Sequence, residues 1–323
     1  MFPKPHTDLK YNTFEFEFLP LVKTTGFREY DARWLFPQEI NLMGVQALGM
    51  GLGTLAQELG VGPEIVTGHD FRSYSSSIKS ALIIGLMATG MKVKDVGLAL
   101  SPIAYFAQFA LDCQSVAMVT ASHNDNGWTG VKMGMNRPLT FGPEEITRLK
   151  DIVMEAAFKF RPGGSYEFFP DIKEKYVENL LNRPKLKRKL RVLTACGNGT
   201  AGLFAERVFK AVGCDVVPMD TNPDFTFPQY NPNPEDMKML HAIAKAVVEN
   251  KCDVGLGFDG DGDRCGVVDN EGNEIFADKV GVMLARSFSE QYPNSTFVSD
   301  VKSTGLFATD PVLKKLGAKA DYW

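Results

Sequence analysis

Residues 255–268 read GLGFDGDGDRCGVV, a strand–loop–strand pattern from which the rest of the chain can be interpreted. An apolar strand runs into a loop in which aspartates alternate with glycines, and a second apolar strand follows. Asp259, Asp261 and Asp263 repel one another, since each pair of carboxylates at about 4–5 Å costs roughly 3–4 kcal/mol at an effective dielectric constant near 20. A hard divalent cation bound through oxygen removes this repulsion. The stretch therefore predicts a metal site at the end of a strand.

Other readings of the same loop fit less well. Gly255, Gly257 and Gly260 match G-x-G-x-x-G, but a dinucleotide-binding turn must lead into a helix, whereas a strand follows here. A calcium-binding EF-hand loop needs glycine at its sixth position and glutamate at its twelfth, where this chain has Arg264 and Asn270. A plain Asp-Gly hairpin turn stays open as an alternative, although it does not need a third aspartate.

The alternation of short apolar runs with helical patterns indicates an α/β protein. The runs predict strands at 64–67, 92–97, 115–120, 191–195, 215–218, 253–258 and 296–300. The helical patterns lie at 38–59, 75–89, 103–111, 143–158, 172–181, 203–212, 236–250, 278–292 and 306–316. The polar stretch 121–134 is interpreted as a loop.

The length and the repeated pattern predict several domains. The chain has 323 residues, 44% of them hydrophobic, and an RPGG linker lies at 161–164. We expect a first α/β domain at 1–160, a second at 161–275 and a partial third at 276–323. Each is a similar unit of mixed sheet flanked by helices. The third has too few elements to bury both faces of a sheet, so we expect it to be incomplete.

Composition argues against nucleic-acid and membrane partners. The net charge is -4, with 35 basic and 39 acidic residues. The five cysteines form no C-x-x-C motif, and the N-terminus lacks the apolar core of a signal peptide, so we expect a cytoplasmic protein. The oligomeric state is left open by the sequence.

A second chemical stretch, residues 120–134, reads TASHNDNGWTGVKMG. It places Ser122 at the carboxyl end of a predicted strand, where sites form in α/β proteins. A serine alone is a weak nucleophile, but His123, Asn124 and Lys132 lie close to it in sequence. An ordinary polar loop remains the alternative on these grounds.

Together these stretches carry a family resemblance. TASHN followed by a lysine ten residues after the serine resembles the phosphoserine loop of the α-D-phosphohexomutases, and GFDGDGDR at 257–264 resembles their metal loop. GFREYDAR at 26–33 is similar to the opening motif of the phosphomannomutase/phosphoglucomutase branch. GHDFRSYSS at 68–76, CGNGTAG at 196–202 and NPNPE at 231–235 resemble further landmarks in the family's order. Family members continue beyond residue 323, so the chain resembles a truncated member that lacks a fourth domain.

The resemblance implies roles for particular residues. Ser122 would carry a phosphoryl group and would share Mg²⁺ with Asp259, Asp261 and Asp263. Lys132 is the expected general acid or base, with a pKa lowered by neighbouring cations, and His123 could share that role. Arg28 and Arg264 would stabilise charge on the transferring phosphoryl group; Tyr30 and Arg33 are interpreted as shaping the cleft.

The implied reaction is an intramolecular phosphoryl transfer. It interconverts hexose 1-phosphate and hexose 6-phosphate, with mannose or glucose as the hexose and hexose 1,6-bisphosphate as the priming donor. A phosphoglucosamine mutase, a non-catalytic phosphosugar-binding fragment and a metal-dependent phosphatase are the alternatives. The choice of hexose, and the choice between Lys132 and His123 as the base, stay open.

Overall fold

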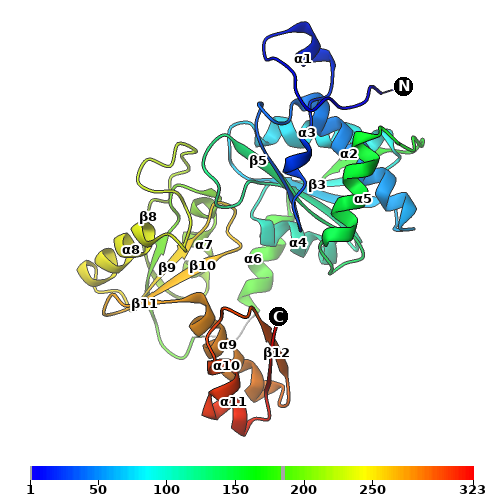
Figure 1. Ribbon diagram of the computed structural model, residues 1–323. Helices are drawn as coiled ribbons and strands as arrows, with labels where there is room; N and C mark the ends of the chain where they lie inside the picture. Colours follow the sequence, from blue (N-terminus) through cyan, green and yellow to red (C-terminus); the bar gives the residue numbers. More distant parts are fainter. Residues whose placement is uncertain (1, 183–185) are drawn as a thin grey trace.

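The computed structural model describes residues 2–182 and 186–323 and contains three sheets along the chain (Figure 1). The first has six strands in the order β1-β5-β4-β2-β3-β6. These are β1 (Ala32–Leu35), β2 (Glu64–His69), β3 (Lys92–Leu98), β4 (Ser115–Val119), β5 (Trp128–Gly134) and β6 (Ser165–Phe168). The sheet is mixed, since β4, β2, β3 and β6 run parallel while β5 pairs antiparallel with both β1 and β4.

Helices cover both faces of the first sheet. On one face lie α2 (Leu42–Glu58), α3 (Ser75–Ala88) and α5 (Pro143–Met154), and on the other lie α4 (Ser101–Ala110) and α6 (Ile172–Leu181). The two short elements at the N-terminus, α1 (Phe14–Phe18) and η1 (Thr24–Gly26), precede β1, and α1 projects at the top of Figure 1. Strand β4 is buried along its whole length between these layers.

The glycines of α2, which lower its intrinsic helix propensity, serve close helix packing. A Cβ on Gly49 would lie 2.3 Å from the carbonyl oxygen of Leu82 in α3, and one on Gly85 would lie 2.1 Å from that of Gln46. Only glycine therefore allows α2 and α3 to approach to this distance. The helix begins after Asn41, whose side chain accepts a hydrogen bond from the Gly44 amide at 2.8 Å.

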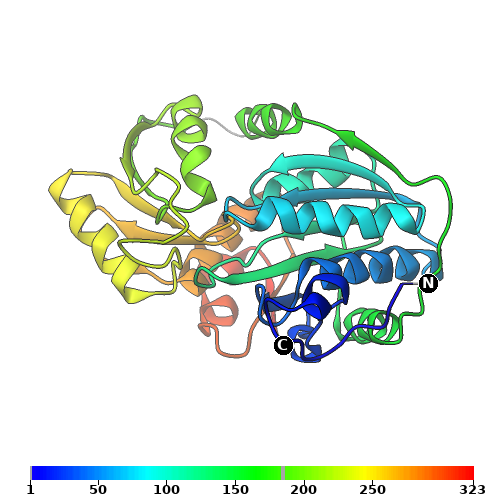
Figure 2. The ribbon, with the colours of Figure 1, turned by 90° about the horizontal axis from the view of Figure 1, so that it is seen from above.

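The second sheet repeats the mixed plan with five strands in the order β11-β10-β9-β7-β8. These are β7 (Arg191–Ala195), β8 (Asp215–Met219), β9 (Val254–Phe258), β10 (Cys265–Asp269) and β11 (Glu274–Ile275). Helix α8 (Met237–Glu249) packs on one face, and η2 (Thr200–Leu203) with α7 (Ala205–Ala211) lies on the other (Figure 2). The aspartate loop joins β9 to the antiparallel β10, in agreement with the sequence.

A smaller unit follows at the bottom of Figure 1. It contains α9 (Ala277–Gln291), β12 (Thr296–Ser299), α10 (Leu306–Thr309), α11 (Pro311–Lys315) and β13 (Lys319–Tyr322). The two strands pair in parallel, and Val282, Ala285 and Leu313 form its small buried cluster.

The predicted fold class is confirmed, because consecutive units of mixed sheet are flanked by helices. Some predicted elements are wrong in detail. The predicted loop at 121–134 ends in strand β5, and the predicted helix 306–316 is divided at Pro311, whose ring and missing N–H break the helical hydrogen bonding. The predicted domain boundary at residue 161 stays a prediction. Strand β6 follows it and pairs with β3 of the first sheet.

The first two units share a core. Val66, Met118 and Ile103 of the first unit belong to the same buried cluster as Cys196 and Ala201 of the second. Since burial of apolar surface is favourable, this cluster holds the two units together. None of the helices in the described part of the chain is long and apolar enough to cross a membrane.

Candidate metal and serine site

Two loops from different sheets meet at the predicted serine and aspartates. Ser122 follows β4 of the first sheet, and Asp259, Asp261 and Asp263 follow β9 of the second. The hydroxyl of Ser122 donates a hydrogen bond to Asp259 Oδ2 at 3.1 Å. A Cβ on Gly260 would lie only 2.4 Å from the Ser122 carbonyl oxygen, so glycine is required for this close approach. The structure thus brings together residues that are more than 130 positions apart in the sequence.

The three aspartates have the geometry and burial of a cation site. One ligand oxygen from each lies within 4.8 Å of the others, and Asp259 and Asp261 have no exposed surface. Among the described residues, Asp261 Oδ1 is buried without a hydrogen-bond partner. Buried carboxylates carry a large desolvation penalty unless a positive charge compensates them. An unpaired buried oxygen beside two further carboxylates therefore fits a divalent cation with oxygen ligands.

The pKa values of the buried pair move in opposite directions. Burial and the negative charges of Asp261 and Asp263 raise the pKa of Asp259. Burial also opposes ionisation of Asp261, but the positive charge of Lys132 and the hydrogen bonds from Lys132 and Ser101 outweigh it and lower the pKa of Asp261. Lys132 and Ser101 therefore favour the charged form of Asp261 in particular.

Lys132 reaches the aspartates from β5. Its Nζ lies 2.7 Å from Asp261 Oδ2 and also contacts Asp263. Burial lowers the pKa of Lys132, but the two carboxylates outweigh burial and the pKa is raised. The prediction of a lowered pKa is therefore wrong for this structure. The reason is that carboxylates, rather than the expected cations, are the nearest charged groups to the ammonium.

His123 is the other proton-transfer candidate, and it lies beside the serine. Its Nδ1 is 3.3 Å from Ser122 Oγ. Burial, followed by the charges of Arg264 and Arg33, lowers the pKa of His123, so that the imidazole is neutral at neutral pH. The His123 carbonyl oxygen accepts a hydrogen bond from Asn231, which belongs to the loop before α8.

Arg28 and Arg264, the two arginines predicted to stabilise the transferring phosphoryl group, lie in different places. A cavity of about 230 Å³ is lined by Ser122, Lys132, Arg33 and Arg264, among other residues. Arg264 also pairs with Glu235 at 3.0 Å. Arg28 is not among the described residues that line this cavity. Its guanidinium lies 5.3 Å from the ring centroid of Trp128, so on this geometry Arg33, rather than Arg28, accompanies Arg264.

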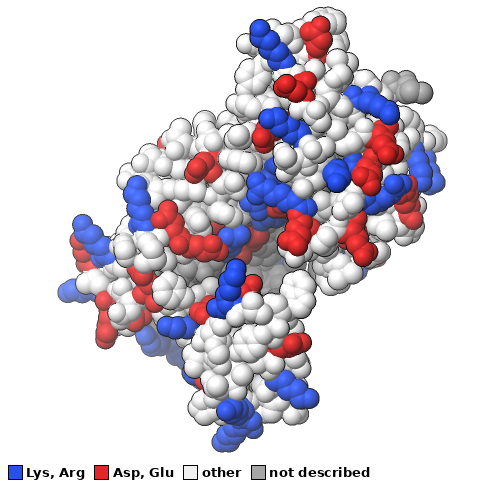
Figure 3. Space-filling view, viewed as in Figure 1, with Lys and Arg blue, Asp and Glu red and all other residues white. Residues whose placement is uncertain are grey.

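A second hollow of about 580 Å³ adjoins the first, because Arg264 lines both. Lys302 and Asp278 of the C-terminal unit contribute to its wall. Figure 3 shows the surface hollowed near the middle of the molecule, with basic and acidic side chains around the rim. The two hollows together offer a polar space beside Ser122.

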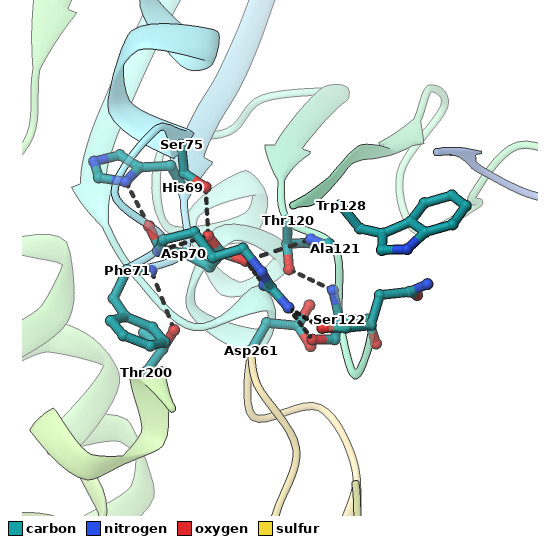
Figure 4. A network of polar contacts seen from close by, with 12 residues as sticks. His69, Asp70, Phe71, Ser75, Thr120, Ala121, Ser122, Trp128, Thr200 and Asp261 are labelled. Carbon is teal, nitrogen blue, oxygen red and sulfur yellow. Dashed lines mark hydrogen bonds and ion pairs between the residues drawn. The ribbon is translucent and has the colours of Figure 1, made fainter. Parts of the chain in front are cut away.

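A buried ion pair holds the serine loop in shape (Figure 4). Asp70 and Arg72 lie between β2 and α3 with fully buried side chains in contact. Arg72 donates to the carbonyl oxygens of Ser122 at 3.1 Å and of Asn124 at 2.6 Å, while Asp70 accepts from the Ala121 amide at 3.3 Å. These bonds support the unusual backbone of Ser122, whose φ is +53°. Asp70 and Arg72 therefore form a structural ion pair that supports the serine loop.

Sequence reasoning missed three residues that reach this site. Ser101 donates to Asp261, Asn231 binds the His123 carbonyl, and Thr200 accepts from the Phe71 amide next to the ion pair. Each lies where a polar residue meets a turn or a helix start, in SP at 101–102, NPNPE and GNGTAG. That pattern marks a loop, but it does not show which loop of the other sheet lies opposite.

Comparisons with known proteins agree with the motifs. Residues 24–160 match the family model described as phosphoglucomutase/phosphomannomutase, alpha/beta/alpha domain I, and residues 174–272 match the corresponding domain II. The chain is 33% identical to the phosphomannomutase/phosphoglucomutase of Pseudomonas putida over 92% of its own length and 63% of the relative's. It is 30% identical to the phosphoglucomutase of Neisseria meningitidis serogroup B, covering 91% of this chain and 63% of that one.

Solved structures give the same result. A phosphoglucomutase/phosphomannomutase family protein from Burkholderia thailandensis superposes with a TM-score of 0.87 at 29% identity, over 94% of this chain and 67% of that one. The chain spans less than two thirds of the length of the two curated relatives. Since two adjacent family models account for most of the chain, and relatives of the same name align along nearly all of it, the chain belongs to the phosphoglucomutase/phosphomannomutase family of phosphohexomutases.

Proposed function

We propose that this protein interconverts hexose 1-phosphate and hexose 6-phosphate through a phosphoryl group carried on Ser122. The observation that carries the proposal is the hydrogen bond of 3.1 Å between Ser122 Oγ and Asp259, at the edge of a three-carboxylate cluster. The Ser122 hydroxyl therefore lies beside a carboxylate cluster suited to a cation. A hairpin turn without a ligand would not require a buried serine hydroxyl against a buried carboxylate.

Asp259, Asp261 and Asp263 would hold Mg²⁺, the cation that suits a few carboxylates together with phosphate oxygens. When bound, Mg²⁺ neutralises phosphate oxygens and makes the phosphorus a better electrophile. Lys132, held cationic by its two carboxylate partners, adds positive charge at the same place. Arg33 of β1 and Arg264 of the aspartate loop both line the cavity and would stabilise the charge of the transferring group.

In this proposal His123 transfers protons and Lys132 supplies positive charge. Transfer from the serine to a sugar hydroxyl breaks the Oγ–phosphorus bond, forms a bond between phosphorus and the sugar oxygen, and moves the hydroxyl proton towards Oγ. Neutral His123, with Nδ1 at 3.3 Å from Oγ, is placed to accept and return a proton there. Lys132 pairs with Asp261 and Asp263 rather than with Ser122 Oγ, so we assign it the electrostatic role.

The substrate class follows from the family and the size of the site. The relatives are named for mannose and glucose phosphates, and hexose 1,6-bisphosphate would prime the serine. The adjoining hollow of about 580 Å³, with Lys302 and Arg264 in its wall, has room for a sugar phosphate. No residue in the described lining of the two hollows singles out an amino sugar.

A mass measurement of phosphorylation at Ser122 tests this proposal. Purified protein incubated with glucose 1,6-bisphosphate and Mg²⁺ should gain about 80 Da, the mass of one phosphoryl group. Ser122→Ala should not gain this mass and should lose glucose phosphate isomerisation. Ser115→Ala is the matched control, because Ser115 lies on β4, is fully buried and has an unpartnered hydroxyl within the described structure.

Two results would contradict the proposal. One is a mass gain in Ser122→Ala equal to that of the unmodified protein. The other is no phosphorylation of the unmodified protein under conditions in which it binds Mg²⁺, which would favour the phosphosugar-binding alternative.

A further inference from the structure

Ser101, the first residue of α4, forms two hydrogen bonds with Asp261 in the loop after β9 of the second sheet. The Ser101 amide donates to the Asp261 carbonyl oxygen at 3.0 Å, and its hydroxyl donates to Asp261 Oδ2 at 2.5 Å. Ser101 has no exposed surface, so both bonds are sheltered from water. One residue of the first unit therefore holds both the backbone and the side chain of a single aspartate in the second unit.

The Ser101 hydroxyl is not used to cap its own helix. Leu100 occupies the N-cap position of α4, and Pro102 follows Ser101 in the first turn. A serine at a helix start ordinarily accepts a hydrogen bond from a backbone amide of that helix. Here the hydroxyl is the donor, and its acceptor is a carboxylate 160 positions away. The bond thus serves Asp261 rather than the helix.

This bond leaves the two oxygens of Asp261 in different environments. Oδ2 accepts from both Ser101 and Lys132, at 2.5 and 2.7 Å. Oδ1 is buried and has no partner among the described residues. The orientation of the carboxylate is therefore fixed by donors on one oxygen, and the other oxygen remains available to a cation.

We propose that Ser101 is a positioning residue for the metal site. It fixes the rotation of the Asp261 carboxylate so that Oδ1 is presented to Mg²⁺ before the ion arrives. Partners of this kind orient metal ligands, and their removal typically weakens metal binding by about 10- to 100-fold. This inference rests on the proposed function only in assigning the aspartates to a cation.

Direct titration of the full chain with Mg²⁺ by isothermal calorimetry tests the inference without relying on turnover. Ser101→Ala should bind Mg²⁺ about 10- to 100-fold more weakly than the unmodified protein. Ser101→Thr keeps the hydroxyl and should restore affinity to within a few-fold. Ser115→Ala should bind as the unmodified protein does, because the buried Ser115 hydroxyl has no hydrogen-bond partner in the described part of the chain. Circular dichroism of each variant establishes that it is folded.

The outcomes separate this inference from the proposed function. Unchanged affinity in folded Ser101→Ala overturns the positioning role while leaving the metal site intact. Equal weakening in folded Ser101→Ala and Ser101→Thr also overturns it, because the hydroxyl would then be irrelevant. No Mg²⁺ binding by the unmodified protein would instead refute the proposed metal site, and the serine phosphorylation experiment reports on Ser122 independently.

Discussion

Replacement of Arg72 by methionine tests how strongly the buried ion pair supports the serine loop. Arg72 contacts Asp70 with both side chains fully buried, and it donates to the carbonyl oxygens of Ser122 and Asn124. Methionine keeps a long side chain but removes the charge and every donor. Asp70 would retain bonds from the Ser75 hydroxyl and from backbone amides, but it would lose its cation.

The expected loss of stability is large because a buried charge is left unpaired. Removal of one partner of a buried pair typically costs about 3–5 kcal/mol. With a urea dependence of about 3 kcal/mol per molar, the unfolding midpoint should fall by roughly 1–1.7 M. The matched control is Arg148→Met, since Arg148 pairs with Glu58 at 2.8 Å but has half of its side chain exposed. Exposed pairs contribute about 1 kcal/mol or less.

Urea unfolding followed by tryptophan fluorescence measures both variants, and the mass assay measures the phosphorylation of Ser122. Arg72→Met should unfold well below Arg148→Met and should also become phosphorylated more slowly, because the loop carrying Ser122 has lost two hydrogen bonds. If Arg72→Met lowers the midpoint no more than Arg148→Met does, the ion pair does not support the loop as we infer.

Two further predictions concern close packing and acid stability. Gly260→Ala should destabilise the protein by about 1–3 kcal/mol and weaken Mg²⁺ binding, since the new methyl would lie 2.4 Å from the Ser122 carbonyl oxygen; Gly62→Ala, with open space around it, should do neither. Arg148 holds the pKa of Glu58 at about 2, below its ordinary 4.5, so this stabilisation is complete above pH 4.5 and is lost as the pH falls through about 2. Glu58→Gln should remove that part of the acid dependence of the urea midpoint, at most about 1 kcal/mol for an exposed pair; an unchanged dependence would contradict it.

Local patterns predicted elements well where the apolar residues of the element recur regularly. The helix at Ile172–Leu181 and the strand at Arg191–Ala195 lie at the positions that periodicity indicates. Strand β5 (Trp128–Gly134) was missed because two glycines and the polar Thr129 and Lys132 interrupt its apolar residues. It forms since it pairs with β1 and β4 on either side, and pairing of this kind depends on distant parts of the chain.

In the candidate site, too, some residues could be predicted from short segments and others depend on distant parts of the chain. The three aspartates and Ser122 could be predicted, because charge repulsion and position after a strand are visible in short segments. Ser101 and Arg33 could not be assigned in the same way, since each acquires its place from a partner about 90 to 160 positions away. The direction of the Lys132 pKa also needed the structure, because it depends on which charges surround the ammonium.

The position of α4 explains how two sheets can share one site. The helix packs against β2 and β4 on the first sheet, and β4 leads directly into the loop of Ser122. At its N-terminus, Ser101 binds Asp261 of the second sheet. The same helix therefore contacts the serine strand and fixes the orientation of the Asp261 carboxylate. The shared core buries this junction. The serine and the aspartates are therefore fixed relative to one another before a ligand binds, and binding requires little further ordering of the site.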